Sequence, residues 1–404
     1  MRAPGPLPIA PGPMPGEAVL SWVARIAARY DLSLSELMAC LRGGVGVYSP
    51  RMAALDWKED LELEGLLARA ACLDRSEIRA MRLVTEPTTN PAVWCRSALA
   101  WCPACVSDDV ARHGESFERA AWQLGCYVAC PSHRLFLARS CVVCGCRRCY
   151  FRPLAGRQRL VCEFCRGAVD ARTPAPASTW FAGAQIGDER IGWYGAVYSP
   201  DLALFAFAMQ ANLLSALGGS TPTLAERCGL SAGKFIAMVT DLAGMVLPPR
   251  DPTEGEVAAP SGQIFATMEG WAVFELLGIV AALIESALKA DTHARPALMR
   301  RMPDGHRVPI DLAWLSHRLA DSELLSLRGR ATQWGLVIGR AIRDAISQEV
   351  SERRRRAVIR ERKRLDAVWL RQASKRYRAE AIKRIQTRAE QYAAQQRSKH
   401  SSVR

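Results

Sequence analysis

Ten of the chain's fourteen cysteines lie between residues 102 and 165, and this segment constrains the fold more than any other part of the sequence. Several of them are separated by two residues, as in Cys102-Pro-Ala-Cys105 and Cys141-Val-Val-Cys144. Such a gap lets a tight turn direct both thiolates toward one metal ion. Two such turns supply the four ligands of tetrahedral zinc and leave no coordination position for water. The segment therefore predicts structural zinc centres, not catalytic ones.

The spacings predict two ligand sets and hence two structural zinc ions. Each set consists of two ligand pairs, and in each pair two residues separate the two ligands. One of the eight ligands is a histidine. The first predicted set is Cys102, Cys105, Cys130 and His133, and the second is Cys141, Cys144, Cys162 and Cys165.

The cysteines allow two alternatives to this ligand assignment, a different cysteine pair and a disulfide framework. Cys146-Arg-Arg-Cys149 is a third two-residue pair, and it could replace Cys141 and Cys144 in the second set. We favour Cys141 and Cys144 because Gly145 follows them directly and gives that turn a permissive backbone. A disulfide framework is disfavoured because such frameworks are typical of short secreted chains.

Length and composition indicate a chain that can bury a sizeable core. With 404 residues and 49% hydrophobic residues, it is long enough for two to four domains. The Pro/Gly-rich N-terminus lacks the apolar core of a signal peptide, so we expect a reduced, cytoplasmic protein. The most apolar stretch, residues 271–290, is interrupted by Glu275 and Glu285, so we expect a buried helix there and no membrane association.

The basic character of the chain belongs to its C-terminal tail. Net charge is +14, and residues 350–404 hold 18 Lys and Arg against five acidic residues. A tail of this kind binds polyanions by releasing counterions, without reading a base sequence. Gly and Pro are absent from Ala341 onward, so we expect a long helix, or else a solvated, disordered tail. The tail residues predicted to contact nucleic acid are Arg353, Arg354, Arg355 and Arg356.

Periodicity and composition predict a mainly α, multi-domain protein with helix-turn-helix modules and a small central zinc region. Linkers are expected in the Pro-rich runs at residues 173–178 and 248–260. The expected parts are an extended N-terminus at 1–16, a helical domain at 17–90, a double zinc region at 91–171, a helical domain at 181–347 and a basic tail at 348–404.

Residues 221–243 satisfy the positional pattern of a helix-turn-helix. Counting from Thr221, Ala225 falls at the crowded fifth position and Gly229 at the turn. The residues expected to be buried are Leu224, Cys228, Leu230, Phe235 and Met238. The second helix, near 232–242, is then expected to expose Ser231, Lys234 and Thr240 to a DNA groove. A protein-binding use of the same motif is the alternative, and residues 18–41 form either a further such motif or an ordinary helical hairpin.

The sequence carries no complete catalytic motif. His113-Gly-Glu115 matches half of a zinc-deaminase signature, but the Pro-Cys-x-x-Cys that should follow it is missing. The stretch from Gly229 to Phe235 differs from a phosphate-binding loop in its glycine spacing and in having Phe235 where Ser or Thr should bind magnesium. We therefore expect a protein that is not an enzyme.

Several of these motifs together resemble the TniQ family of transposon proteins. They are, in order, PGEAVLSWVARIA, WCPAC, AAWQLGCYVACPSHRLFL, CVVCG and CEFC, and the resemblance covers about residues 7–170. The chain's size and helical C-terminal half are similar to the full-length form found in mercury-resistance-type transposons. The resemblance assigns zinc to the same eight ligands, and the additional pair Cys146 and Cys149 departs from the family pattern.

The resemblance implies a non-catalytic, DNA-associated target-selection or adaptor subunit. Such a subunit works beside a DDE transposase and an AAA+ ATPase, and some relatives dock onto an RNA-guided complex and form head-to-tail dimers. The alternative interpretation is a zinc-containing DNA-binding transcription regulator that acts alone.

Overall fold

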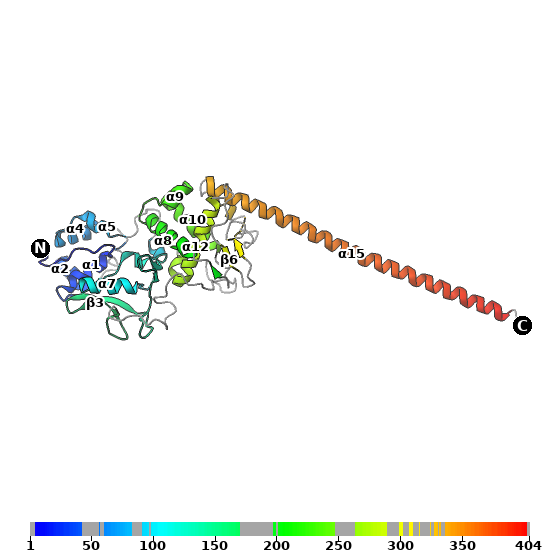
Figure 1. The fold of residues 1–404 in the computed structure, drawn as a ribbon, viewed down its shortest axis with the longest axis horizontal. Coiled ribbons are helices and arrows are strands. Elements are labelled where there is room, and N and C mark those ends of the chain that lie inside the picture. Colours follow the sequence, from blue (N-terminus) through cyan, green and yellow to red (C-terminus); the bar gives the residue numbers. More distant parts are fainter. Residues whose placement is uncertain are drawn as a thin grey trace. The chain divides into compact units, whose positions relative to one another are not determined.

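The chain is mostly helical, with a few short strands (Figure 1). The computed structural model describes residues 5–42, 56, 60–82, 91–96, 98–169, 197–198, 201–246, 263–288, 299–301, 307–309, 315, 324, 327–329, 331–332 and 336–401. The chain divides into two compact units, residues 1–343 and residues 344–404. The linkers expected at 173–178 and 248–260 lie outside the described residues.

Four helices of the N-terminal region share one apolar core. They are α1 (Val19–Ala28), α2 (Leu34–Leu41), α4 (Leu61–Ala71) and α5 (Arg75–Ala80). Apolar residues recur at helical spacing on α1, so Trp22 and Ile26 face this core and are almost fully buried. Ser33 begins α2 with a capping box, and Asp31, whose φ is 52°, turns the chain between α1 and α2. The two helices expected within residues 18–41 are therefore present.

The central region combines short helices with two β-hairpins. Its helices are α6 (Pro91–Trp94), α7 (Pro103–His113) and the 3₁₀ helix η1 (Ala120–Gln123). β1 (Ala129–Cys130) pairs antiparallel with β2 (Leu135–Phe136), and β3 (Cys149–Leu154) pairs antiparallel with β4 (Arg157–Cys162). The β3–β4 register places Cys149 opposite Cys162.

The apolar run at residues 124–128 is of a kind that predicts a short strand, but it turns the chain after η1 instead. The amide of Leu124 donates to the carbonyl of Ala121, and that of Tyr127 donates to the carbonyl of Leu124. Gly125 lies against α11 (Gln263–Thr267), where an added Cβ would come within 2.5 Å of the Phe265 and Ala266 backbone. This close approach requires a residue without a side chain.

A buried ionic network joins α1 to the central region. The Arg25 side chain is fully buried and lies 3.0 Å from the Glu17 carboxylate and 3.4 Å from that of Glu115. Arg29 also pairs with Glu115, at 2.6 Å, and donates to the carbonyl of Gly156 in the β3–β4 turn. Buried charges are tolerated when each has an opposite charge and hydrogen bonds, so this network fixes α1 on the hairpin.

The second half of the first unit is a helical assembly. It consists of α8 (Asp201–Leu217), α9 (Thr223–Cys228), α10 (Ala232–Val246), α11 and α12 (Gly270–Leu288), with α8 packed against α10 and α12. β6 (Met299–Arg301) pairs antiparallel with both β5 (Val197–Tyr198) and β7 (Arg307–Pro309). Among the described helices, α12 alone is long and apolar enough to cross a bilayer, and it is mostly buried inside the protein. A core helix meets the same criterion, as expected for residues 271–290.

Gln210 connects this helical assembly to the central region. Its side chain is buried on α8, where Oε1 accepts from the amides of Val128 and Ala129 and Nε2 donates to the Ala129 carbonyl at 2.8 Å. The glutamine amide thus provides hydrogen-bond partners for the backbone N–H and C=O groups at the start of β1, as a neighbouring strand would. Trp94 stacks on Phe265 nearby, with ring centroids 5.2 Å apart.

The C-terminal helix α15 runs from Leu336 to Ser401 (Figure 1). Of the two alternatives expected beyond Ala341, a long helix or a disordered tail, this is the helix. Several large apolar side chains on it are exposed, including Val358, Trp369 and Ile385.

Candidate metal centres

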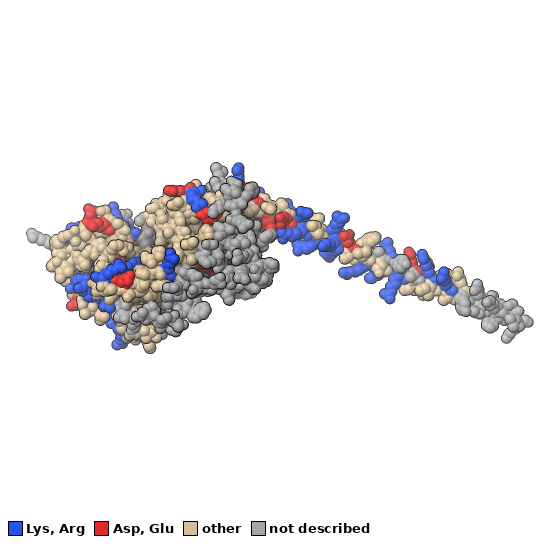
Figure 2. Space-filling view, viewed as in Figure 1, with Lys and Arg blue, Asp and Glu red and all other residues tan. Residues whose placement is uncertain are grey.

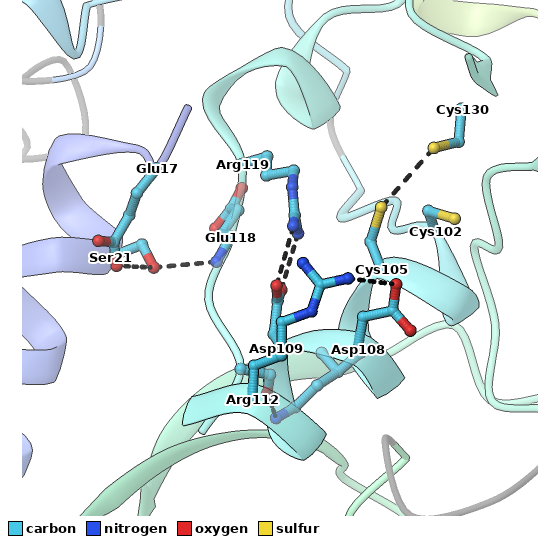
Figure 3. A network of polar contacts seen from close by, with 12 residues as sticks. Glu17, Ser21, Cys102, Cys105, Asp108, Asp109, Arg112, Glu118, Arg119 and Cys130 are labelled. Carbon is cyan, nitrogen blue, oxygen red and sulfur yellow. Dashed lines mark hydrogen bonds and ion pairs between the residues drawn. The ribbon is translucent and has the colours of Figure 1, made fainter. Parts of the chain in front are cut away.

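The first four predicted ligands lie together at the junction of α7 with the β1–β2 hairpin. Cys102 precedes α7, Cys105 lies in its first turn, Cys130 ends β1, and His133 lies in the turn before β2. Their donor atoms all lie within 4.8 Å of one another. Figure 3 shows the three cysteines converging.

The distances in this group match the edges of a zinc tetrahedron. Metal–ligand lengths near 2.3 Å for sulfur and 2.0–2.1 Å for nitrogen give edges of about 3.8 Å between two sulfurs and about 3.6 Å between sulfur and nitrogen. The sulfurs of Cys105 and Cys130 are 3.6 Å apart. The Nδ1 atom of His133 lies 3.3–3.5 Å from the three sulfurs. These residues therefore fit one tetrahedral ion.

Asp108 orients the histidine of this group. Its Oδ2 atom lies 3.2 Å from Nε2 of His133, on the ring side opposite the sulfurs. A carboxylate there holds the proton on Nε2 and leaves Nδ1 free to bind a metal. Cysteine spacing alone does not identify Asp108, although its position three residues after Cys105 on α7 places it on nearly the same helix face.

The thiols of the first group differ in pKa. Hydrogen bonds from Cys102 and then Cys105 lower the pKa of Cys130 well below its usual range. A hydrogen bond involving Cys105 lowers the pKa of Cys102, but bonding to Cys130 and burial together raise it to about 11. Metal binding to such a cluster must release protons, because thiolates are the ligands.

The second group lies at the base of the β3–β4 hairpin. The sulfurs of Cys144 and Cys162 are 3.6 Å apart, and all four donors lie within 4.8 Å of one another. Burial raises the pKa of the Cys162 thiol, but hydrogen bonds led by the backbone of Cys165 lower it to about 6. The clustered residues are Cys141, Cys144, Cys162 and Cys165.

The alternative pair, Cys146 and Cys149, does not belong to either group within the part of the chain that the structure describes. The Cys146 sulfur accepts from the amide of Arg148 at 3.4 Å. Cys149 donates to the Cys146 carbonyl at 3.7 Å. The geometry therefore favours Cys141 and Cys144, as expected from Gly145.

Three of the four ligand turns share one backbone arrangement. The residue after the second ligand is left-handed in each, with φ of 52° at Arg134, 71° at Gly145 and 55° at Arg166. Its amide donates to the carbonyl of the first ligand at 2.8–2.9 Å. The fourth turn, at Cys102, is instead the start of α7, where Pro103 favours the first helical position.

Both groups could hold metal ions, and their donor sets are consistent with zinc. Each supplies four soft or borderline ligands from turns far apart in sequence. A filled coordination sphere would join α7 to β1 in the first group, and the two ends of the β3–β4 hairpin in the second. This chemistry supports folding and leaves no position for a substrate.

The helices expected to contact DNA, α9 and α10, are joined by residues 229–231. Gly229 has φ of 68°, and the five positions expected to be buried are buried. Ser231 and Lys234 are exposed. The expected exposure of Thr240 is wrong: the residue is 4% exposed, and its hydroxyl donates to the Ile236 carbonyl. Thr240 is nine residues after Ser231, and nine residues rotate a helix by about two and a half turns. Thr240 therefore lies on the side opposite Ser231.

The four arginines expected to contact nucleic acid lie on α15. Arg353 pairs with Glu349 and Arg356 with Glu352, each at helical i,i+4 spacing. Arg354 and Arg355 are exposed.

Comparison with known families finds a match to the TniQ family over residues 8–137. The matched range begins before α1 and ends just after β2, so it includes the first metal group and not the second. Among curated proteins, none matches this sequence significantly.

Proposed function

Since this chain belongs to the TniQ family through residues 8–137, and that family consists of transposition accessory proteins, we propose that it selects target DNA for a transposon. In this proposal the protein is not an enzyme. It tethers target DNA and recruits an AAA+ ATPase and a DDE transposase. The family match is the observation that carries the proposal. An RNA-guided complex and a second copy of the chain are further candidate partners, by analogy with the family.

The two metal groups support a scaffolding role. Each offers four protein donors, so zinc bound there would hold α7 against β1 and close the base of the β3–β4 hairpin, and would not activate water. The hydrogen bond from Gln210 on α8 to the Ala129 carbonyl then links β1 to the helical assembly. A surface of the matched N-terminal region is the proposed docking site for the ATPase.

Two features support DNA contact. We propose that α9 and α10 form a helix-turn-helix, in which Ser231 and Lys234 face the major groove as the second helix enters it. Lys and Arg side chains are spread along α15 (Figure 2). We propose that Arg353, Arg354, Arg355 and Arg356 contact phosphates, which adds affinity without sequence preference.

Tethering can be tested by retention of the ATPase on immobilised target DNA. We expect the ATPase of the same transposon to be retained only when this protein is present. Retention should fall when Lys234→Ala is combined with glutamine at the four α15 arginines. A variant with lysine at those four positions keeps the charge and serves as the control. Equal retention with and without the protein would contradict the proposal, and tight binding of one operator without the ATPase would favour a stand-alone regulator.

A further inference from the structure

A cavity of about 400 Å³ lies between α1, the chain following α6, and the β3–β4 hairpin. None of the eight metal-donor residues lines it. Two carboxylates and two amides form most of its polar lining, namely Asp56, Glu118, Gln123 and Gln158. The lining is therefore rich in hydrogen-bond acceptors.

The hydrogen bonds of Ser21 fix the orientation of the Gln158 amide. Ser21 has one hydroxyl hydrogen, which it donates to Oε1 of Glu17 (Figure 3). Nε2 of Gln158 must then donate to the Ser21 oxygen, at 3.0 Å. This leaves Oε1 of Gln158, on a fully buried side chain, with no hydrogen-bond partner in the described part of the chain. A buried acceptor without a donor is costly.

Gln123 is fixed in the same way by the two carboxylates. Its Nε2 atom donates to Oδ2 of Asp56 at 2.9 Å, and its side chain also hydrogen-bonds Glu118. Ionised carboxylates only accept, so Gln123 presents its amino group to them when both are ionised. Its Oε1 atom is a second buried acceptor that has no partner among the described residues.

Arg96, the one cation among the described lining residues, is directed away from these groups. Arg96 directs Nη2 to the backbone carbonyls of Leu124 and Tyr127, at 2.5 and 2.8 Å. Burial raises the pKa of both carboxyls, that of Glu118 to about 7, and the charge of Asp56 adds to the shift at Glu118. A cation bound beside these carboxyls would favour their ionised form and would supply donors to the amide oxygens that the described lining leaves without one.

We propose that this cavity binds a guanidinium group, whose planar set of N–H donors would pair with Glu118 and the two orphaned amide oxygens. The group can be presented by an arginine side chain of a partner protein or by a small free guanidinium compound. This site lies outside the proposed DNA contacts and does not depend on them.

Calorimetric titration of the full-length protein with n-butylguanidinium tests the proposal. The matched control ligand is n-butylurea, which has nearly the same shape and no charge. We expect saturable 1:1 binding of butylguanidinium and at least tenfold weaker binding of butylurea. Equal binding of the two compounds, or binding of neither, would overturn the proposal. A capped Ala-Arg-Ala tripeptide separates the sources: binding at least as tight as butylguanidinium indicates a protein partner, and weaker binding a small free compound.

Variants of the lining residues test whether butylguanidinium binds in this cavity. Glu118→Gln should weaken binding of butylguanidinium at least tenfold, whereas Glu62→Gln, at an exposed position on α4, should leave it unchanged. Ala98→Phe fills the cavity without removing a carboxylate and should abolish binding even if Glu118→Gln fails to fold. Undiminished binding to a folded Ala98→Phe variant would contradict the assignment.

Discussion

At the scale of single residues, side chains outside the ligand sets control the proposed metal centres. Asp108 is the clearest case, because it holds the tautomer of His133 that can bind a metal. The pattern of cysteines could not identify it, since any carboxylate brought near by the fold would serve. The predicted ligands themselves follow from local spacing, and for this reason all eight fall into two groups as expected.

Asp108→Ala should weaken zinc binding at the first centre about tenfold or more. The measurement is competition with a chromophoric chelator, read as two phases of metal release. The second centre should be unchanged and provides an internal control. Arg112→Ala, which removes the exposed partner of Asp108, should have little effect. Equal affinities for the Asp108→Ala variant and the wild type would show that His133 is not oriented by this carboxylate.

Glu17 should make stability depend on pH. Burial raises the pKa of its carboxyl from 4.5 to about 7, against the opposing effect of Arg25. Between these values the folded chain binds more protons than the unfolded chain. The contribution of Glu17 to stability is therefore fully present below about pH 4.5 and is lost as pH rises through 7, by at most about 3 kcal/mol.

Glu17→Gln should remove this dependence. Urea unfolding at several pH values would then show the free energy of unfolding of the wild type falling relative to that of the variant between about pH 4.5 and 7. The exposed Glu62→Gln serves as the control and should keep the wild-type slope. Parallel profiles for wild type and Glu17→Gln would contradict the assignment.

At the scale of elements, helices follow from the sequence better than the contacts between them. Amphipathic spacing and capping residues are local, and they account for α1 and α2 within the segment 18–41 where two helices are expected. The turn at residues 124–128 depends instead on Gly125 against α11 and on Gln210 from α8. Such partners lie more than 80 residues away, so an apolar run alone could not distinguish this turn from a strand.

The β3–β4 hairpin should depend on one zinc ion bound by four particular cysteines. We expect two zinc ions per chain in the wild type, one in Cys162→Ser and two in Cys146→Ser, as measured by elemental analysis of the purified proteins. Cys146→Ser is the matched control, because its sulfur lies outside the clustered donors. Loss of one ion from Cys146→Ser would instead support the alternative ligand pair.

At the scale of the whole molecule, charge is concentrated on one element. The 18 basic residues from 350 to 404 lie almost entirely on α15, so binding to DNA should depend steeply on salt. Replacing the four arginines at 353–356 with glutamine should reduce the slope of log K against log salt by about 1 for each arginine that binds a phosphate in the wild type. Lysine at the same positions should preserve the slope. An unchanged slope with glutamine would show that these arginines do not bind phosphate.

Target selection by tethering is the central claim, and counting and mapping insertions in cells tests it most directly. The cells carry the transposase and ATPase of the same transposon, with or without this protein. We expect insertions to vanish or to scatter without it, and Cys130→Ser to behave like the deletion because the first metal group is broken, whereas Cys146→Ser should behave like the wild type. Insertions unchanged in number and position without the protein would contradict the account.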